Sequence, residues 1–316
     1  MASVGGFVTK SVTLKPRKGN NPPRLYETSG GLLNSIGLEN EGLDYFVDKR
    51  IEELSQFKTS VFVNLAPSER CELTGMIEQL NAFDCIDGYE VNISCPNIHR
   101  GGFNLNSSID DSRALLSGIR CKTDKTLILK LSPAFSESFD IALFAEDEGF
   151  DSISFTNTYL GTAVDIDKRR FIFSNRVAGL SGPAVKPMSL WNVYRMTQTV
   201  GIPVIGIGGI MDWQDVIKFM LVGATAIQLG TVNFFEPMAL NHILKNLKEY
   251  LDPGDMIIMN NSRVIPARLY GAKIPTGTEI EILLLNELAE GRWEVLVRPG
   301  RRAKKGVKIN FEDILE

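Results

Sequence analysis

The sequence is poor in metal-binding side chains and has no long apolar run. Its 316 residues include two histidines and four cysteines. The cysteines form no close CxxC pair, so neither a zinc site nor an iron–sulfur cluster is expected within this chain. No stretch approaches the roughly 20 apolar residues of a membrane span, and the opening residues lack the apolar core of a secretory signal. We therefore expect a cytoplasmic protein with reduced thiols and no bound metal.

Neither sign of charge dominates the chain. The formal net charge is -4, which gives no reason to expect nucleic acid or an anionic membrane as a main partner. Hydrophobic residues make up 44% of the sequence, enough to bury a large core in one domain or two.

Short apolar runs alternate with amphipathic stretches of helical length over most of the chain. Near-continuous apolar strands that alternate with helices predict a parallel sheet covered by helices. The expected strands are 7–12, 60–64, 89–94, 127–131, 152–156, 203–207 and 224–229. The expected helices are 42–56, 69–81, 108–121, 137–148, 187–200, 212–221 and 237–250.

Polar or glycine residues stand at or just past nearly every strand end. A (β/α)8 barrel builds its active site from these ends, whereas an open doubly wound sheet concentrates its ligand contacts at one switch point. The pattern therefore favours a barrel. These residues are Lys10, Asn64, Asn92, Lys130, Asn157, Gly208 and Gly230.

The strand at 89–94 runs directly into Asn92, Cys95 and Asn97. At a barrel mouth this thiol and the two carboxamides would face one ligand. The alternative is a buried, inert cysteine beside a turn.

Two glycine-rich turns follow the last two strands, at 206–210 and 229–232. Glycines let backbone N–H groups approach an anion, and Asp212 is placed to cap the helix that follows the first turn. Barrels often bind phosphate after their last strands. The alternative is a pair of tight turns that need positive φ.

Eight motifs in order resemble class 1 dihydroorotate dehydrogenase, and its B type in particular, over residues 5–251. They are VTKSVTLKPRKGNNPPRL, GGLLNSIGLENEGLD, EVNISCPN, LILKLSP, ISFTNTYLG, GLSGPAVKP, GIGGI and LGTVNF. The resemblance implies a TIM-type barrel that oxidises dihydroorotate to orotate in pyrimidine biosynthesis with FMN at its mouth. It also implies a partner subunit that carries FAD and an iron–sulfur cluster and passes electrons to NAD.

The resemblance also assigns roles to individual residues. Cys95 would be the catalytic base. The substrate would be bound by Lys10, Asn34, Ser35, Ile36, Gly37, Leu38, Asn92, Asn157 and Thr158. FMN would be bound by Lys10, Asn64, Asn92, Lys130, Thr156, Gly182, Gly208, Gly209, Gly230 and Thr231.

These residue types suit the reaction. A base removes a proton from one carbon while hydride leaves the neighbouring carbon for the flavin. A free thiol has a pKa of about 8.5, so a Cys95 base predicts activity that rises toward alkaline pH. A cation at Lys130 or Lys10 would stabilise the charge that the flavin gains on reduction; the alternative is that both lysines cap strand ends in solvent. Asparagines match the alternating N–H and C=O groups of a pyrimidine, although a single asparagine is often only a turn residue.

The chain departs from the family at its beginning. The family has a strand upstream of 7–12, so one strand of this barrel is expected to be absent. An incomplete barrel would leave the strands 7–12 and 224–229 with unpaired edges. We therefore expect a chain that is weakly stable or that forms a homodimer through the gap, and that binds FMN poorly.

Residues 252–316 have a different character and predict a small all-β unit. Strands are expected at 256–260, 264–273, 279–286, 293–297 and 307–311. The segment resembles an N-terminal fragment of the S-adenosylmethionine:tRNA ribosyltransferase-isomerase of queuosine synthesis. Its basic cluster would contact tRNA or would be a solvated loop, and we favour the loop because phosphate binding needs a broader basic surface. The cluster consists of Arg298, Arg301, Arg302, Lys304, Lys305 and Lys308.

Two alternatives to an active dihydroorotate dehydrogenase follow from these departures. One is another flavin barrel reductase that acts on a pyrimidine. The other is an inactive fusion of two truncated enzymes.

Overall fold

A computed structural model of the chain describes residues 4–93, 109–247, 256–260, 268–274, 276, 278–289, 292–298 and 308–310. The chain divides into two compact units, Met1–Ser262 and Arg263–Glu316. The sequence placed this boundary after residue 251, so the observed division falls later in the chain. None of the helices in the described ranges is long and apolar enough to cross a membrane.

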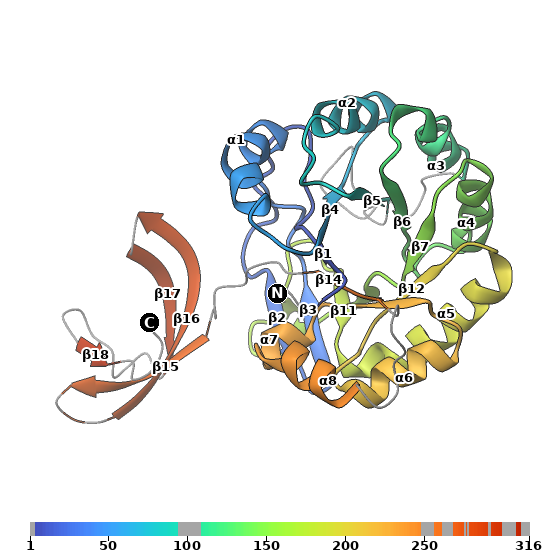
Figure 1. Cartoon of the computed structure of the whole chain (residues 1–316). Coiled ribbons are helices and arrows are strands. Elements are labelled where there is room, and N and C mark those ends of the chain that lie inside the picture. Colours follow the sequence, from blue (N-terminus) through green and yellow to red (C-terminus); the bar gives the residue numbers. More distant parts are fainter. Residues whose placement is uncertain are drawn as a thin grey trace. The chain divides into compact units, whose positions relative to one another are not determined.

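The first unit is built on a closed barrel of parallel strands (Figure 1). The strands, in order around the barrel, are β1 (Gly6–Val8), β14 (Met256–Asn260), β13 (Ala226–Leu229), β12 (Val204–Ile207), β7 (Ser152–Phe155), β6 (Thr126–Lys130), β5 (Gly88–Asn92) and β4 (Ser60–Leu65). The expected α/β barrel of the TIM type is confirmed.

Helices surround the strands on the outside of the barrel (Figure 1). They are α1 (Leu43–Leu54), α2 (Arg70–Leu80), α3 (Ile109–Leu116), α4 (Ser138–Asp147), α5 (Lys186–Thr199), α6 (Trp213–Leu221), α7 (Val232–Phe235) and α8 (Ala239–Leu247), with short 3-10 turns η1 (Arg120–Lys122) and η2 (Pro183–Val185). The Asp212 side chain caps α6 as predicted, because it accepts a hydrogen bond from the Asp215 N–H at 2.8 Å.

Strand residues alternate between two hydrophobic clusters because successive side chains point to opposite faces. Val63, Val91, Leu129 and Ile227 belong to the large cluster that also contains helix residues. A separate small cluster takes one residue from each of five strands, and it therefore lies inside the barrel. Its members are Val8, Phe62, Ile128, Ile205 and Ala226.

Strand β14 completes the barrel where the sequence predicted a gap. It pairs in parallel with β1, with Ile258 opposite Gly6, and with β13, with Ile258 opposite Gln228. The expectation that the strands at 7–12 and 224–229 would have unpaired edges is therefore wrong. The stretch 256–260 was correctly predicted as a strand but was assigned to the small β unit. Its local pattern cannot specify its partners, because any buried parallel strand is a short apolar run.

An antiparallel sheet is inserted between barrel elements. Its order is β2 (Leu25–Thr28), β3 (Gly31–Asn34), β11 (Ala178–Ser181) and β8 (Tyr159–Gly161). A two-stranded ribbon, β9 (Val164–Asp165) with β10 (Arg170–Phe171), lies in the same stretch of chain as β8. This sheet joins the segment after β3 to the loop after β7.

The second unit is an antiparallel sheet in the order β17 (Arg292–Arg298), β16 (Thr278–Ala289), β15 (Arg268–Ile274) and β18 (Lys308–Asn310). The β16–β17 ladder shifts register between Leu284 and Asn286 and again between Glu287 and Ala289. Apart from 256–260, the strands expected in the tail are present in this unit.

Candidate active site at the carboxyl ends of the barrel strands

The polar residues singled out from the sequence stand at the carboxyl ends of the barrel strands. Asn92 and Lys130 are the last residues of β5 and β6, and Asn64 is the penultimate residue of β4. In barrel enzymes this edge of the sheet carries the active site. Thr9, Thr156, Gly208 and Gly230 directly follow β1, β7, β12 and β13.

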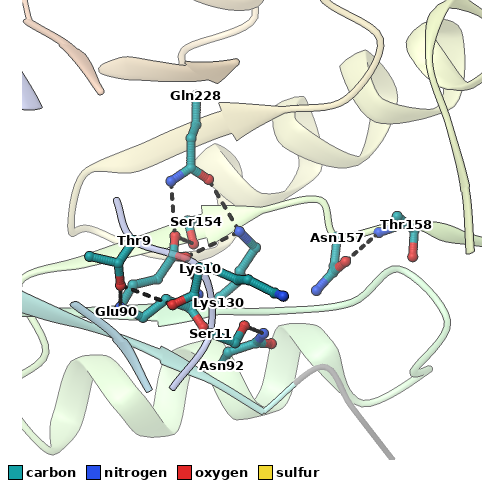
Figure 2. A network of polar contacts seen from close by, with 11 residues as sticks. Thr9, Lys10, Ser11, Glu90, Asn92, Lys130, Ser154, Asn157, Thr158 and Gln228 are labelled. Atoms are coloured by element: carbon teal, nitrogen blue, oxygen red, sulfur yellow. Dashed lines mark hydrogen bonds and ion pairs between the residues drawn. The ribbon is translucent and has the colours of Figure 1, made fainter. Parts of the chain in front are cut away.

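A buried carboxylate on β5 binds side chains from four other barrel strands. Glu90 on β5 is fully buried, and its Oε1 accepts hydrogen bonds from Asn64 Nδ2 at 2.5 Å and from Lys130 Nζ at 3.1 Å. Its Oε2 accepts from Ser154 Oγ at 2.9 Å and from Gln228 Nε2 at 3.2 Å. Gln228 Oε1 also accepts from Lys130 Nζ at 3.3 Å. Figure 2 shows Gln228, Ser154 and Lys130 converging on this carboxylate.

Asn64 carries an unused acceptor in this layer. Asn64 is 2% exposed. Within the described part of the chain, its Oδ1 is the one buried side-chain nitrogen or oxygen atom that has no hydrogen-bond partner. Buried polar atoms are nearly always hydrogen-bonded, so such an atom calls for an explanation. The acceptor of Asn64 and the ammonium of Lys130 together match the pyrimidine edge of a flavin, which offers N–H and C=O groups in alternation. The residues present therefore fit a flavin.

Lys10 and Asn92 lie beside the Glu90 network (Figure 2). The Lys10 side chain is exposed, whereas Asn92 is 7% exposed. Asn92 Nδ2 donates to Ser11 Oγ at 3.4 Å, which ties β5 to the segment after β1. The two residues offer one cation and one carboxamide at the same edge of the sheet.

The antiparallel sheet brings the predicted substrate residues together. Asn34 Nδ2 donates to the Gly179 carbonyl at 3.1 Å, and the Thr158 side chain packs directly against Gly179. Asn157 Oδ1 accepts from the Thr158 N–H at 2.7 Å, so this asparagine also shapes its own turn. Ser35, which is 7% exposed, accepts from Asn20 Nδ2 at 3.0 Å. Asn34 and the loop after β7 therefore meet at β11.

The glycine turn after β12 is conformationally demanding. Gly208 and Gly209 have φ of 124° and 75°, and a Cβ on Gly209 would lie 2.8 Å from the Lys186 backbone nitrogen and 2.9 Å from the Gly182 carbonyl. Only glycine fits such a position without strain. The turn thus places the predicted residues Gly182, Gly208 and Gly209 side by side.

The turn after β13 is open by comparison. A Cβ on Gly230 would meet nothing within 4 Å among the described residues, and Thr231 follows directly as the first residue before α7. Thr156 directly follows β7 and contacts the end of β12: its hydroxyl is 3.2 Å from Ser189 Oγ and donates to the Ile207 carbonyl at 3.3 Å.

A cluster of one carboxylate and two lysines lies next to the glycine turn after β12. Asp215 is fully buried and accepts hydrogen bonds from Lys186 Nζ at 2.5 Å, Lys218 Nζ at 2.9 Å and the Met211 N–H at 3.0 Å. Burial is the largest single influence and opposes ionisation, but the hydrogen bonds from the two lysines and Met211 together hold the pKa of Asp215 below its ordinary value. The cluster fixes the start of α6 against Lys186.

The predicted base lies outside the described residues. Cys95 and the neighbouring Asn97 belong to the stretch 94–108. Their assignment stays a prediction from the sequence.

Comparison with known proteins gives two family matches. The model of the dihydroorotate dehydrogenase family matches residues 1–251, which is most of the chain. The chain belongs to the dihydroorotate dehydrogenase family. A second model, described as queuosine biosynthesis protein, matches residues 232–316 and overlaps the end of the first match.

Curated relatives agree with this assignment. The catalytic subunit of dihydroorotate dehydrogenase B (NAD(+)) of Bacteroides thetaiotaomicron is 41% identical over 252 residues, which are 80% of this chain and 83% of the relative. The subunits of the same name from Phocaeicola vulgatus and Geotalea uraniireducens are each 42% identical over 252 residues, with the same coverage. The chain is thus a flavoprotein oxidoreductase that oxidises dihydroorotate in pyrimidine biosynthesis, as expected. Neither alternative, a different reductase or an inactive fusion, is favoured.

Sequence reasoning missed three residues of the buried polar network at the strand ends. Glu90, Ser154 and Gln228 each lie two residues before a strand-end position that was singled out: Asn92, Thr156 and Gly230. Because side chains alternate along a strand, residues two apart share the inward face. The available signal was Glu90, a charged residue in a buried strand whose side chain points to the inward face.

Proposed function

We propose that this dihydroorotate dehydrogenase holds FMN at the carboxyl ends of its strands. The observation that carries the proposal is the unpartnered, buried Oδ1 of Asn64, a residue whose Nδ2 binds the same Glu90 oxygen as the Lys130 ammonium. The FMN residues are Lys10, Asn64, Asn92, Lys130, Thr156, Gly182, Gly208, Gly209, Gly230 and Thr231. When bound, the flavin accepts the hydride that leaves the substrate.

The glycine turns suit the phosphate group of FMN. The positive φ of Gly208 and Gly209 keeps side chains off the turn, and backbone N–H groups there are able to face an anion. The Lys186 backbone and Cβ lie against the same turn, and its ammonium is held by Asp215. This location also agrees with the frequent use of the last two barrel strands for phosphate binding.

The proposed substrate is (S)-dihydroorotate, bound by the segment around Asn34 and the loop after β7. The residues are Lys10, Asn34, Ser35, Ile36, Gly37, Leu38, Asn92, Asn157 and Thr158. Support comes from the contacts of Asn34 and Thr158 with Gly179, which bring the two segments to one place. Carboxamides reject apolar mimics of the ring, because such mimics leave buried amides unpaired.

Cys95 is the proposed base that removes the substrate proton. A thiol with an ordinary pKa of about 8.5 is mostly protonated at neutral pH, so the rate should rise toward alkaline pH. Measuring turnover from neutral to alkaline pH for the unmodified chain and for Cys95→Ser tests this role. A serine variant with an unchanged pH profile would contradict it.

Asn64→Leu provides the sharpest test of the flavin site. The change removes the unpaired acceptor and the donor to Glu90 at similar volume. We expect weaker FMN binding, measured by quenching of flavin fluorescence, and slower anaerobic bleaching of the flavin by dihydroorotate. Asn246→Leu on α8 is the control, because Asn246 is exposed and its side chain donates to the His242 backbone carbonyl. It should leave both quantities unchanged; equal FMN affinity in the two variants would exclude Asn64 from the site.

The B-type relatives are named as catalytic subunits, and this supports a partner for electron disposal. We propose that this partner carries FAD and an iron–sulfur cluster and reduces NAD. The homodimer stays a prediction, and β14 fills the gap through which it was expected to form. Mixing the reduced protein with NAD should give no NADH until such a subunit is added. The tail is proposed to derive from the N-terminal part of a tRNA ribosyltransferase-isomerase and to lack transferase activity; product from S-adenosylmethionine and tRNA would contradict that.

A further inference from the structure

Glu90 is a buried carboxylate inside the barrel, and its hydrogen-bond partners among the described residues are all donors. An ionised carboxylate is purely an acceptor, and four donors from four strands occupy its two oxygens. The apolar inner cluster includes Ile128, which is paired in register with Glu90 on the neighbouring strand β6. Such a charge is costly to bury unless it is paired, so the site depends on these donors.

The donors reach Glu90 from distant parts of the chain. Asn64, Lys130, Ser154 and Gln228 are separated from it by 26, 40, 64 and 138 residues. One group thereby sets the direction of two side chains proposed to face the flavin, Asn64 and Lys130. Figure 2 shows that the lysine and the glutamine approach the carboxylate from different elements.

The two members of the Lys130–Glu90 ion pair differ in their exposure to solvent. The Lys130 side chain is 10% exposed and the Glu90 side chain is 0% exposed. The lysine is therefore the partner that is more accessible from outside the barrel core. A buried ion pair is a weak source of stability, since well-packed apolar residues often serve as well. A role in the chemistry of the site explains the pair better than a role in folding.

We infer that Glu90 is a positioning residue of the flavin site: its carboxylate orients Lys130 and Asn64 and offsets the lysine charge, and so it lowers the reduction potential of the bound flavin. The inference rests on the proposed location of FMN. Lys130 with a neutral neighbour would stabilise the charge of a reduced flavin more strongly than Lys130 paired with a carboxylate.

The test is the midpoint potential of the flavin in the full chain carrying Glu90→Gln, measured by equilibration with a reference dye. The variant keeps the side-chain size and removes the charge. We expect a positive shift equivalent to about a tenfold change in the reduction equilibrium, about 30 mV for a two-electron couple. Ser154→Ala is the matched control: it removes a 2.9 Å hydrogen bond to the same carboxylate but leaves the charge, and should shift the potential much less.

Two results would overturn the inference. A yellow Glu90→Gln protein whose potential is unchanged or lower than that of the unmodified chain refutes the role of Glu90 alone. A full chain that takes up no flavin refutes the proposed site, and the role of Glu90 with it.

A second measurement covers the case in which Glu90→Gln does not fold. Without flavin, Lys130→Met should lower the denaturation midpoint because it leaves the buried carboxylate without its cation. Lys130→Met combined with Glu90→Gln should recover part of that loss, since neither charge remains. A double variant no more stable than Lys130→Met would show that the two residues are not coupled, and would overturn the inference.

Discussion

Replacing Ile258 by proline tests whether the barrel depends on β14. Ile258 pairs with Gly6 on one side and with Gln228 on the other, so it stands in the middle of a central strand. Proline has no N–H and is found in sheets essentially only at edges or bulges. The change removes one ladder hydrogen bond and leaves a carbonyl unpaired, which costs about 2 to 4 kcal/mol.

Removal of the whole of β14 sets the upper limit of the loss in unfolding free energy. β14 has three registered pairs with β1 and four with β13. At about one hydrogen bond per pair and about 1 kcal/mol each, its two ladders contribute on the order of 7 kcal/mol. Domains of this kind are stable by only about 5 to 15 kcal/mol. A chain that ends after residue 251 should therefore unfold or associate through the exposed edges of β1 and β13, whereas a chain that ends after Ser262 should keep the barrel.

The assay is denaturant unfolding followed by circular dichroism at 222 nm. The described helices all belong to the first unit, so this signal reports the barrel. Tyr270→Pro in β15, a strand of the second unit, is the matched control and should leave the helical transition unchanged. If Ile258→Pro and the chain ending at residue 251 unfold like the unmodified protein, β14 does not hold the barrel closed.

Three further predictions concern the two glycine turns and the ion cluster around Asp215. Asp215→Asn should destabilise the protein by about 3 kcal/mol at neutral pH, because Lys186 loses a buried ionic partner. The pKa of Asp215 is lower in the folded than in the unfolded protein, so its contribution to stability is present above the unfolded-state pKa of about 3.9 and is lost as the pH falls through the folded-state pKa. The unfolding midpoints of the unmodified protein and the variant should therefore converge in acid. A difference that stays constant with pH would contradict this argument. Gly209→Ala should destabilise the protein by about 1 to 3 kcal/mol, because φ is 75° and the backbone is close. Gly230→Ala should leave the unfolding midpoint of the flavin-free protein unchanged yet weaken FMN binding, and unaltered FMN affinity would remove Gly230 from the site.

The barrel was predictable because its signals are local. Each strand is a short apolar run, each helix has its own periodicity, and residues such as Asn64 and Lys130 stand at strand ends whatever the tertiary structure does. Family motifs then supplied the reaction and the roles of single residues. The second segment was correctly seen as β structure for the same reason.

Tertiary structure alone decided two features. The sequence identified 256–260 as a strand but could not say that it pairs with β1 and β13, because hydrogen bonds between strands are backbone interactions that carry no local sequence code. It also could not reveal that Glu90 meets Lys130 and Gln228, since these residues are brought together only when the sheet closes and their shared inward faces converge. Local residue patterns determined which elements form, and closure of the barrel determined which of them meet.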